Sequence, residues 1–162
     1  MSDVEGLDNV LKALEMVGST DEIMAAMGKA CALVVRTAIQ KAPKGSGGSS
    51  GLGGSIKSKV ETDSTEVKGI VYTPLEYAPY VEYGTGLFAE GGNGKKEPWY
   101  IPIGNDFTES DAKRYGYQII KGKNGMKWAK TTGAKPHPFL RPALNENREK
   151  ILQILKEGIG ND

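Results

Sequence analysis

Long apolar stretches, histidine and cysteine are all scarce in this sequence, and each shortage excludes a class of protein. No apolar run approaches the roughly 20 residues that a membrane-spanning helix needs. Cys31 is the single cysteine, so no internal disulfide can form, and a reducing compartment fits the chain. The acidic start, residues 1–5, lacks the basic-then-apolar order of a signal peptide. We therefore expect a protein that is made in the cytoplasm and has no membrane contact.

Neither sign of charge dominates the composition. Lys and Arg number 21 and Asp and Glu number 20, which leaves a net charge of +1 at pH 7. This near-balance gives no long-range attraction towards phosphate, so composition argues against a dedicated nucleic-acid binder. The length of 162 residues and the mass of 17.4 kDa suit a single domain, residues 1–162, with one hydrophobic core.

The residues that usually carry catalysis or bind metals form no pattern. His137 is the one histidine and stands between two prolines, whereas a metal site needs three or four converging ligands. No sequence feature places a nucleophile beside it, as a hydrolase would require. The glycine-containing stretches at Gly84 and Gly94 match neither a dinucleotide-binding nor a phosphate-binding loop. We therefore expect no catalytic activity, no cofactor and no metal.

Glycine, in contrast, is abundant and clustered. Of the 162 residues, 22 are glycine, and many lie in the stretch from Lys44 to Gly54, in which Leu52 is the one apolar residue. Such a stretch buries too little apolar surface to offset its ordering entropy, so we expect a mobile arm in an isolated subunit. Residues 90–96 predict a second glycine-rich loop, exposed to solvent.

Hydrophobic periodicity predicts helices at both ends of the chain and strands between them. A short helix is expected over residues 7–17, and a longer one from Ser19 or Thr20 to a stop before Pro43, with Cys31 buried on its apolar stripe. A C-terminal helix with Pro142 as its first residue is expected to direct Leu144, Ile151, Leu155 and Ile159 to the core. Apolar and β-branched residues that alternate with polar ones, together with turn residues between them, predict strands at residues 55–60, 66–72, 99–103, 118–121 and 126–130. The last two flank Asn124-Gly125, a strong hairpin signal.

This order predicts an α+β fold with an antiparallel sheet packed against a long N-terminal helix and a C-terminal helix. The fold is also expected to carry glycine-rich extended loops. Along the chain we expect four consecutive parts. They are a helical part (1–43), the glycine arm (44–54), a β-rich part (55–131), and a proline-rich motif with the C-terminal helix (132–162).

Two short motifs stand out from this background. The first is YAPYVEYGTG, residues 77–86, where tyrosines recur at every third position; this spacing fits a packed helical turn as well as a subunit contact. The second is TGAKPHPFLRPAL, residues 132–144. Its prolines fix an extended approach, so Phe139 and Leu140 are expected to anchor the C-terminal helix, while Arg141 faces a neighbouring subunit or solvent.

With the N-terminal helix and the glycine arm, the two motifs resemble the tailed-phage neck or head–tail joining family, often labelled "tail component", over residues 20–158. The resemblance implies a non-enzymatic virion protein that forms a homo-oligomeric ring in the neck. Its partners would be the head-closing connector and the tail-terminator or tail-tube proteins, with a possible passing contact with packaged DNA. Matching positions in the first motif are Tyr77, Ala78, Val81, Glu82, Gly84 and Thr85, and in the second Gly133, Pro136, Pro138, Phe139, Leu140, Pro142 and Ala143.

From these positions we predict two sets of residues. Core anchors are Tyr77, Val81, Phe139 and Leu140. Subunit or partner contacts are Leu52, Tyr80, Glu82, Tyr83, Thr85, His137 and Arg141.

Three other functions stay open. A tail-terminator subunit would share the size and the fold type. A small DNA-binding module could use Lys121, Lys123, Lys127 and Lys130 on the predicted hairpin, although lysines there also keep sheet edges from aggregating. A hydrolase would depend on His137.

Overall fold

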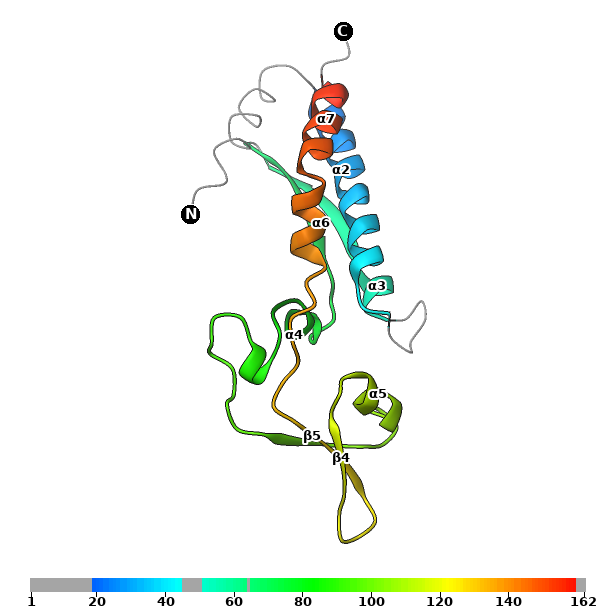
Figure 1. Ribbon diagram of the computed structural model, residues 1–162. Helices are drawn as coiled ribbons and strands as arrows, with labels where there is room; N and C mark the ends of the chain where they lie inside the picture. The colour runs from blue at the N-terminus through cyan, green and yellow to red at the C-terminus, as the bar shows by residue number, and fades with distance from the viewer. Residues whose placement is uncertain (1–18, 45–50, 64, 160–162) are drawn as a thin grey trace. The chain divides into compact units, whose positions relative to one another are not determined.

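The computed structural model describes residues 19–44, 51–63 and 65–159, and it divides the chain into two compact units (Figure 1). Unit 1 holds the chain up to Leu75 and again from Phe139 onward, and unit 2 holds Glu76–Pro138. The helix predicted over residues 7–17 lies outside the described residues, and so do residues 45–50 of the predicted glycine arm.

Helix α2 (Thr20–Lys41) is the central element of unit 1. Its start is a capping box: the Ser19 hydroxyl accepts the backbone N–H of Glu22 at 3.3 Å, and the Glu22 carboxylate accepts the N–H of Ser19 at 3.1 Å. At the other end, Ala42 turns to extended backbone with a ψ of 138° before Pro43. Both predicted ends of this helix are confirmed.

A two-stranded antiparallel ribbon covers one side of α2. Strand β1 (Lys57–Thr62) pairs with β2 (Val67–Tyr72), and both contact α2. The approach is closest at Gly69 of β2, where an added Cβ would lie 2.6 Å from the Sγ of Cys31. Before the ribbon, the short helix α3 (Leu52–Ser55) also contacts α2 and buries Leu52, so the end of the predicted glycine arm is helical.

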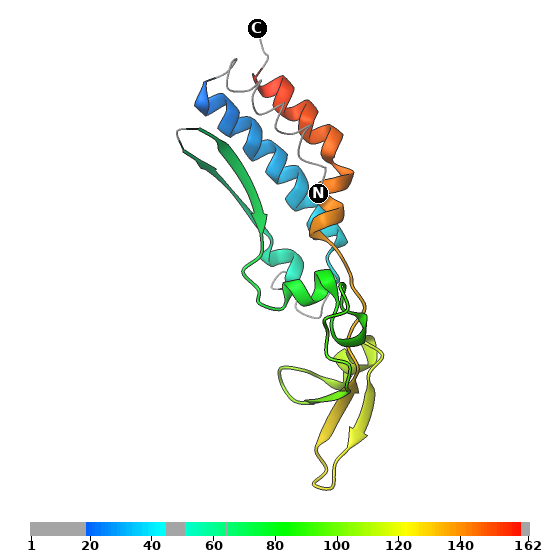
Figure 2. The ribbon, with the colours of Figure 1, turned by 90° about the vertical axis from the view of Figure 1, so that its left-hand side faces the viewer.

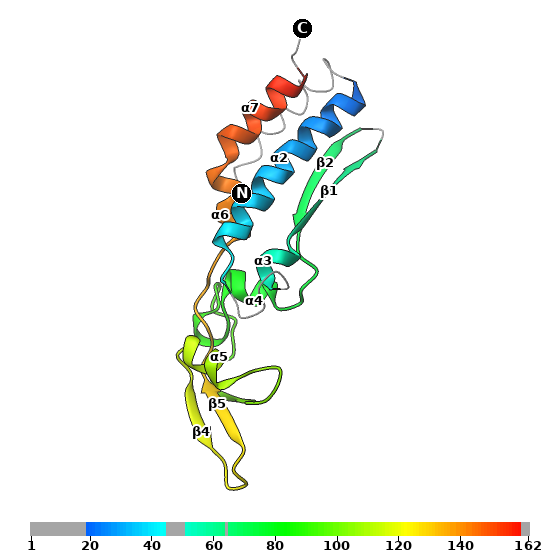
Figure 3. The ribbon, with the colours of Figure 1, turned by 90° about the vertical axis from the view of Figure 1, so that its right-hand side faces the viewer.

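Two helices cover the other side of α2, which therefore lies between them and the ribbon (Figures 2 and 3). They are α6 (Leu140–Glu146) and α7 (Arg148–Ile159). Ala26, Leu155 and Ile159 are the buried centre of this contact, with Ile23, Met27 and Ile151 packed around them. The sequence predicted that the C-terminal helix packs on the sheet. It packs on α2 instead, because α2 already covers the inner face of the ribbon.

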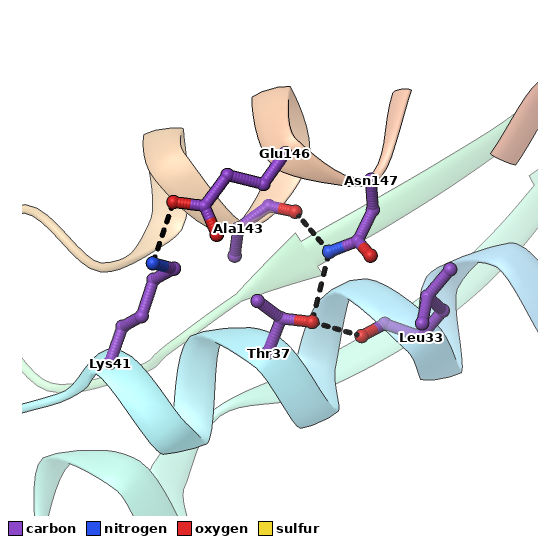
Figure 4. A network of polar contacts seen from close by, with 6 residues as sticks. All are labelled: Leu33, Thr37, Lys41, Ala143, Glu146 and Asn147. Carbon is purple, nitrogen blue, oxygen red and sulfur yellow. Dashed lines mark hydrogen bonds and ion pairs between the residues drawn. The ribbon is translucent and has the colours of Figure 1, made fainter. Parts of the chain in front are cut away.

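A break at Asn147 divides the predicted C-terminal helix. The side-chain amide of Asn147 donates to the carbonyl of Ala143 at 2.8 Å and to the hydroxyl of Thr37 on α2 at 2.9 Å (Figure 4). The prediction that Leu144 faces the core is wrong, since its side chain is 54% exposed, because the break separates α6 from the apolar stripe of α7. Pro142 lies in the first turn of α6, where a missing N–H removes no helical hydrogen bond.

Unit 2 contains a three-stranded antiparallel sheet in the order β3-β5-β4. The strands are β3 (Trp99–Pro102), β4 (Gln118–Lys121) and β5 (Lys127–Thr131). The predicted hairpin around Asn124-Gly125 joins β4 to β5, with Gly125 at a φ of +77°. Helix α5 (Glu109–Arg114) was not predicted, although its capping box between Thr108 and Asp111 is visible in the sequence.

The predicted α+β class is confirmed. The strands form two small antiparallel sheets, one in each unit, because α4 (Ala78–Tyr83) and the 3-10 turn η2 (Gly86–Phe88) separate β2 from β3. The units meet along the chain at residues 75–76 and 138–139, and the second sequence motif spans the latter boundary.

Candidate functional site

The first sequence motif forms the short helix α4 and the turn that follows it. Tyr77 precedes α4, Pro79 lies in its first turn, where no N–H is needed, and Gly84 ends it. Gly84 has a φ of +75°, and a Cβ there would lie 2.7 Å from the carbonyl oxygen of Phe88 and 2.8 Å from the ring of Pro136. Glycine is therefore required at this turn for conformation and for space.

The two motifs lie side by side within unit 2 and pair through their backbones. The N–H of Thr85 donates to the carbonyl of Ala134 at 2.9 Å, and the N–H of Leu87 donates to that of Thr132 at 2.9 Å. The hydroxyl of Thr85 accepts the N–H of Ala134 at 2.9 Å, across 49 residues of sequence. We call this paired region, residues 77–89 with residues 131–137, the motif junction.

Two glycines allow the two backbone segments of the motif junction to approach this closely. A Cβ on Gly86 would lie 2.1 Å from the carbonyl oxygen of Thr132, and one on Gly133 would lie 2.0 Å from that of Thr85. Both obstacles are backbone atoms, which cannot rotate away. Gly94 is equally close to Gly86, so the predicted second glycine-rich loop folds back onto the junction.

Apolar side chains are concentrated on the outside of the motif junction. Tyr80 is 62% exposed, and large fractions of four further side chains of this segment are exposed, those of Tyr77, Tyr83, Leu87 and Phe88. An open depression of about 690 Å³ lies beside Tyr80, with Trp99, Ala89 and Lys95 among its lining residues. A cluster of exposed aromatic and aliphatic side chains on a small unit is typical of a surface that binds another protein.

The predicted contact residues divide between surface and interior. Tyr80, Tyr83 and His137 are exposed, and Thr85 and Arg141 are half-buried, whereas Leu52 and Glu82 are buried at 4% and 3% exposure. Among the predicted anchors, Phe139 is fully buried, Val81 and Leu140 are half-buried, and Tyr77 is 47% exposed.

The motif junction brings Val81, Thr85 and His137 together. The backbone N–H of His137 donates to the carbonyl of Val81 at 2.8 Å. Gly86 belongs to the first motif and Gly94 to the predicted second loop, but their contact with each other, and that of Leu87 with Thr132, could not be predicted because it depends on a pairing between distant segments.

The described residues also include the polar and titratable groups that a catalytic or metal site would use. Within residues 19–44, 51–63 and 65–159, no group of three or more His, Cys, Asp or Glu side chains is arranged to hold a metal ion. Over the same residues, every buried side-chain nitrogen or oxygen has a hydrogen-bond partner. Burial raises the pKa of the Cys31 thiol, which disfavours the reactive thiolate. Among the helices described, none is long and apolar enough to cross a membrane.

Comparison with known protein families gives a match, which includes most of the first motif. Residues 5–84 match a family described as "Bacteriophage HK97-gp10, putative tail-component", a range that includes α2, the ribbon and α4. No curated protein and no solved structure matches the chain. The predicted resemblance to a tailed-phage tail component is thereby confirmed: residues 5–84 are similar to the HK97-gp10-like family of putative phage tail components.

Proposed function

We propose that this protein is a subunit of a ring in the phage neck, where it joins the head to the tail. The family match over residues 5–84 supports a tail-related structural role, and the second motif, which lies beyond the matched residues, supports the narrower assignment to the neck. Its partners are then further copies of itself, the head-closing connector, and the tail-terminator or tail-tube proteins.

The exposed apolar surface of the motif junction is the observation that carries this proposal. Tyr80, Tyr83 and Leu87 each leave about half of their side chain or more in water, at 62%, 46% and 54% exposure. Leaving so much apolar surface in water is unfavourable, and covering it with a partner recovers about 25 cal/mol for each Å² buried. At the same time the backbone beneath is held by the paired motifs, so the surface is presented in a fixed conformation.

A closed ring needs two different surfaces on each subunit, because identical subunits repeat head to tail around the axis. The motif junction is one such surface. Its exposed aromatic side chains are of the kind found at the centre of protein–protein interfaces. Four of the predicted contacts lie in the motif junction, namely Tyr80, Tyr83, Thr85 and His137, and Arg141 lies on α6 of unit 1. All five are proposed to face neighbours in the ring.

The test is made on virions. We expect many copies of the protein per particle, located by electron microscopy at the junction of head and tail. Tyr80→Ser should leave the protein folded but reduce the number of heads joined to tails, since a half-exposed tyrosine contributes to binding and little to folding. Tyr72→Ser is the matched control, because Tyr72 is exposed on β2 of unit 1.

Three outcomes contradict the proposal. One is a single copy per virion, and a second is absence from purified particles. The third is a protein that remains on tails purified without heads and caps them, which would support the tail-terminator function.

A further inference from the structure

The ribbon of unit 1 is a sheet of two strands with an edge on each side. Within residues 19–44, 51–63 and 65–159, β1 pairs with β2 and with no other strand, and β2 likewise pairs with β1 alone. A sheet edge presents a row of backbone N–H and C=O groups that is a ready template for a further strand. The ribbon therefore offers two such rows, one on β1 and one on β2.

The turn of the ribbon shows which residues supply these groups. The N–H of Asp63 donates to the carbonyl of Glu66 at 3.1 Å, so this pair beside the turn is a hydrogen-bonded pair. Hydrogen-bonded and non-hydrogen-bonded pairs alternate along an antiparallel ladder, which makes Val60 and Gly69 a non-hydrogen-bonded pair. The backbone groups of every second residue therefore point to the edges. These residues are Ser58, Val60 and Thr62 on β1 and Val67, Gly69 and Val71 on β2.

The same six residues direct their side chains to the inner face of the ribbon, towards α2. Gly69 fixes this face, because a Cβ there would lie 2.6 Å from the Sγ of Cys31. None of the six is charged or a proline, and the register continues without a bulge over six positions of each strand. Inward charges, prolines and bulges are the usual means of blocking an edge. Both edges of this ribbon lack them.

Helix α2 covers the two strands of the ribbon unequally. On β2 the inner side chains of Val67 and Val71 are half-buried, whereas Ser58 and Thr62 on β1 are exposed. The inner side of β1 is therefore the less protected part of the ribbon. A second ribbon placed against the β1 edge would bring its own α2 beneath this side, which a lone strand from another protein would not do.

We propose that the β2 edge of one copy pairs with the β1 edge of the next copy, so that the ribbons form one continuous sheet. This contact rests on the proposed ring for its setting and lies wholly within unit 1. Because β1 and β2 are antiparallel, copies that repeat in one orientation bring β2 of each copy antiparallel to β1 of its neighbour. Such a head-to-tail repeat is what a closed ring requires.

The pleat and the charges of the outer face select one register. The inner faces of both copies stay on one side only if the register shifts in steps of two residues. Placing Glu61 of one copy opposite Lys68 of the next satisfies this condition and pairs opposite charges. A shift of two residues in one direction places Lys59 opposite Lys68, and a shift in the other direction loses the charge pair. In the selected register Lys59 of one copy lies opposite Ile70 of the next.

Main-chain hydrogen bonds supply most of the affinity in a contact of this kind. Truncating a single outer-face side chain at the end of β2, such as that of Tyr72, should therefore leave the contact in place.

Disulfide cross-linking between two variants tests the proposal. Lys59→Cys chains and Ile70→Cys chains are assembled together into particles and oxidised. Directly opposite residues have Cβ atoms about 4.5–5.5 Å apart, close to the separation that a disulfide bridges. We expect a covalent dimer from the mixture and none from either variant alone. The parent, whose Cys31 is buried, should give none. The matched control mixes Lys59→Cys with Gln153→Cys, which is exposed on α7 on the other side of α2, and it should also give none.

Each other product of cross-linking has a definite meaning. A covalent dimer from Lys59→Cys alone or from Ile70→Cys alone would show twofold pairing of like edges and overturn the proposal. A covalent product with another virion protein would overturn it as well. Many copies per particle without the mixed dimer would overturn this contact and leave the proposed ring standing, whereas a single copy per particle would overturn both.

A proline at the β1 edge gives a second, independent test. Ser58→Pro removes an N–H that the ladder between β1 and β2 does not use, so the ribbon should persist while a bond to the next copy is lost. We expect fewer heads joined to tails than with Ser58→Val, which keeps the N–H. A Ser58→Pro protein with the circular dichroism of the parent that joins heads to tails like Ser58→Val would overturn the proposal. If Ser58→Pro does not fold, the cross-linking result decides.

Discussion

The side-chain amide of Asn147 donates a hydrogen bond of 2.9 Å to the hydroxyl of Thr37, joining residues 110 positions apart in the chain. Asn147 is only 5% exposed, and its amide also donates to the carbonyl of Ala143, in the middle of α6. The Thr37 hydroxyl in turn donates to the carbonyl of Leu33 at 3.1 Å. The break between α6 and α7 is therefore fixed against α2 by a chain of satisfied polar groups.

A double-mutant cycle should detect this link. Thr37→Val and Asn147→Ala are each expected to lower the free energy of unfolding by about 1–3 kcal/mol. The first leaves the buried amide of Asn147 short of a partner, and the second removes both hydrogen bonds of that amide. The double variant should lose less than the sum, with a coupling of about 0.5–1.5 kcal/mol. Denaturant unfolding measures all four proteins. The control combines Thr37→Val with Gln153→Ala, because the Gln153 amide bonds Glu157 on the surface of α7 and does not contact Thr37. The losses of stability should be additive in this control. Coupling between Thr37 and Gln153, or no coupling between Thr37 and Asn147, would contradict the proposed link between α2 and the break.

Two glycines of unit 1 should respond to alanine with opposite signs. Gly69→Ala places a methyl group 2.6 Å from the Sγ of Cys31 and 2.7 Å from the Sδ of Met27, so it should destabilise unit 1 by about 1–3 kcal/mol. Gly28→Ala lies within α2 with nothing inside 4 Å, and it should stabilise the protein by roughly 0.5–1 kcal/mol. Thermal melts followed by helical circular dichroism compare the two. Equal effects at both positions would show that the ribbon does not rest on α2 at Gly69.

Truncation should separate the buried and exposed residues around α6. Phe139 is fully buried in front of α6, so Phe139→Ala is expected to cost about 3–5 kcal/mol by leaving a cavity. Leu144→Ala removes a side chain that is 54% exposed and should change stability by no more than about 0.5 kcal/mol. Chemical denaturation gives both values, and a large loss for Leu144→Ala would show that it is covered in solution.

Alanine at Gly133 should disrupt the motif junction, whereas alanine at Gly91 should not. Both glycines have positive φ angles, +123° and +84°, so both substitutions introduce backbone strain. Only Gly133→Ala also forces a methyl group to within 2.0 Å of the carbonyl oxygen of Thr85, since nothing lies within 4 Å at Gly91. Both tryptophans are in unit 2, so tryptophan fluorescence reports its unfolding. We expect Gly133→Ala to unfold unit 2 at a clearly lower denaturant concentration and to give few joined particles. Gly91→Ala should lose only the smaller stability that its positive φ costs, and it should join heads to tails like the parent.

The stability of unit 2 should fall in acid partly through Asp111. Hydrogen bonds from the side chain and the backbone of Thr108 hold the pKa of the Asp111 carboxyl below its usual value. Because the pKa is lower in the folded state, this stabilisation is complete above about pH 4 and is lost as the pH falls through the folded pKa. Asp111→Asn should therefore lower the melting temperature at pH 7 and weaken its dependence on pH below 4. An unchanged acid dependence in Asp111→Asn would contradict this role.

Local signals in the sequence were sufficient to predict α2 and the hairpin of β4 and β5. The capping box at Ser19 and Glu22 and the stop before Pro43 determine α2, and Asn124-Gly125 determines the hairpin of β4 and β5. Each of these signals acts between neighbouring residues, so it operates wherever the segment lies in the fold. For the first motif the sequence left a helical turn open beside other readings, and the structure shows a helical turn that ends at Gly84.

Relationships between distant segments could not be predicted in this way. Helix α5 was missed although its capping box is a local signal, because that signal lies in a segment without apolar periodicity. The burial of Leu52, in contrast, depends on a distant segment. Its stretch has a composition that predicts mobility, yet α2 provides an apolar surface on which Leu52 is buried at 4% exposure. Leu144 continues the apolar pattern of the C-terminal helix but is exposed, because Asn147 breaks that helix to bond Thr37.

The sequence by itself therefore determined α2, the hairpin, the α+β class and the two motifs, since these depend on side-chain periodicity, caps and turn residues. Only the tertiary structure decided what the glycines at positions 69, 86 and 133 are for. Each allows backbone or sulfur from a distant segment to approach where a Cβ would collide. Such close approaches leave no periodic trace in the sequence, because they depend on which segments meet and not on what stands beside each glycine.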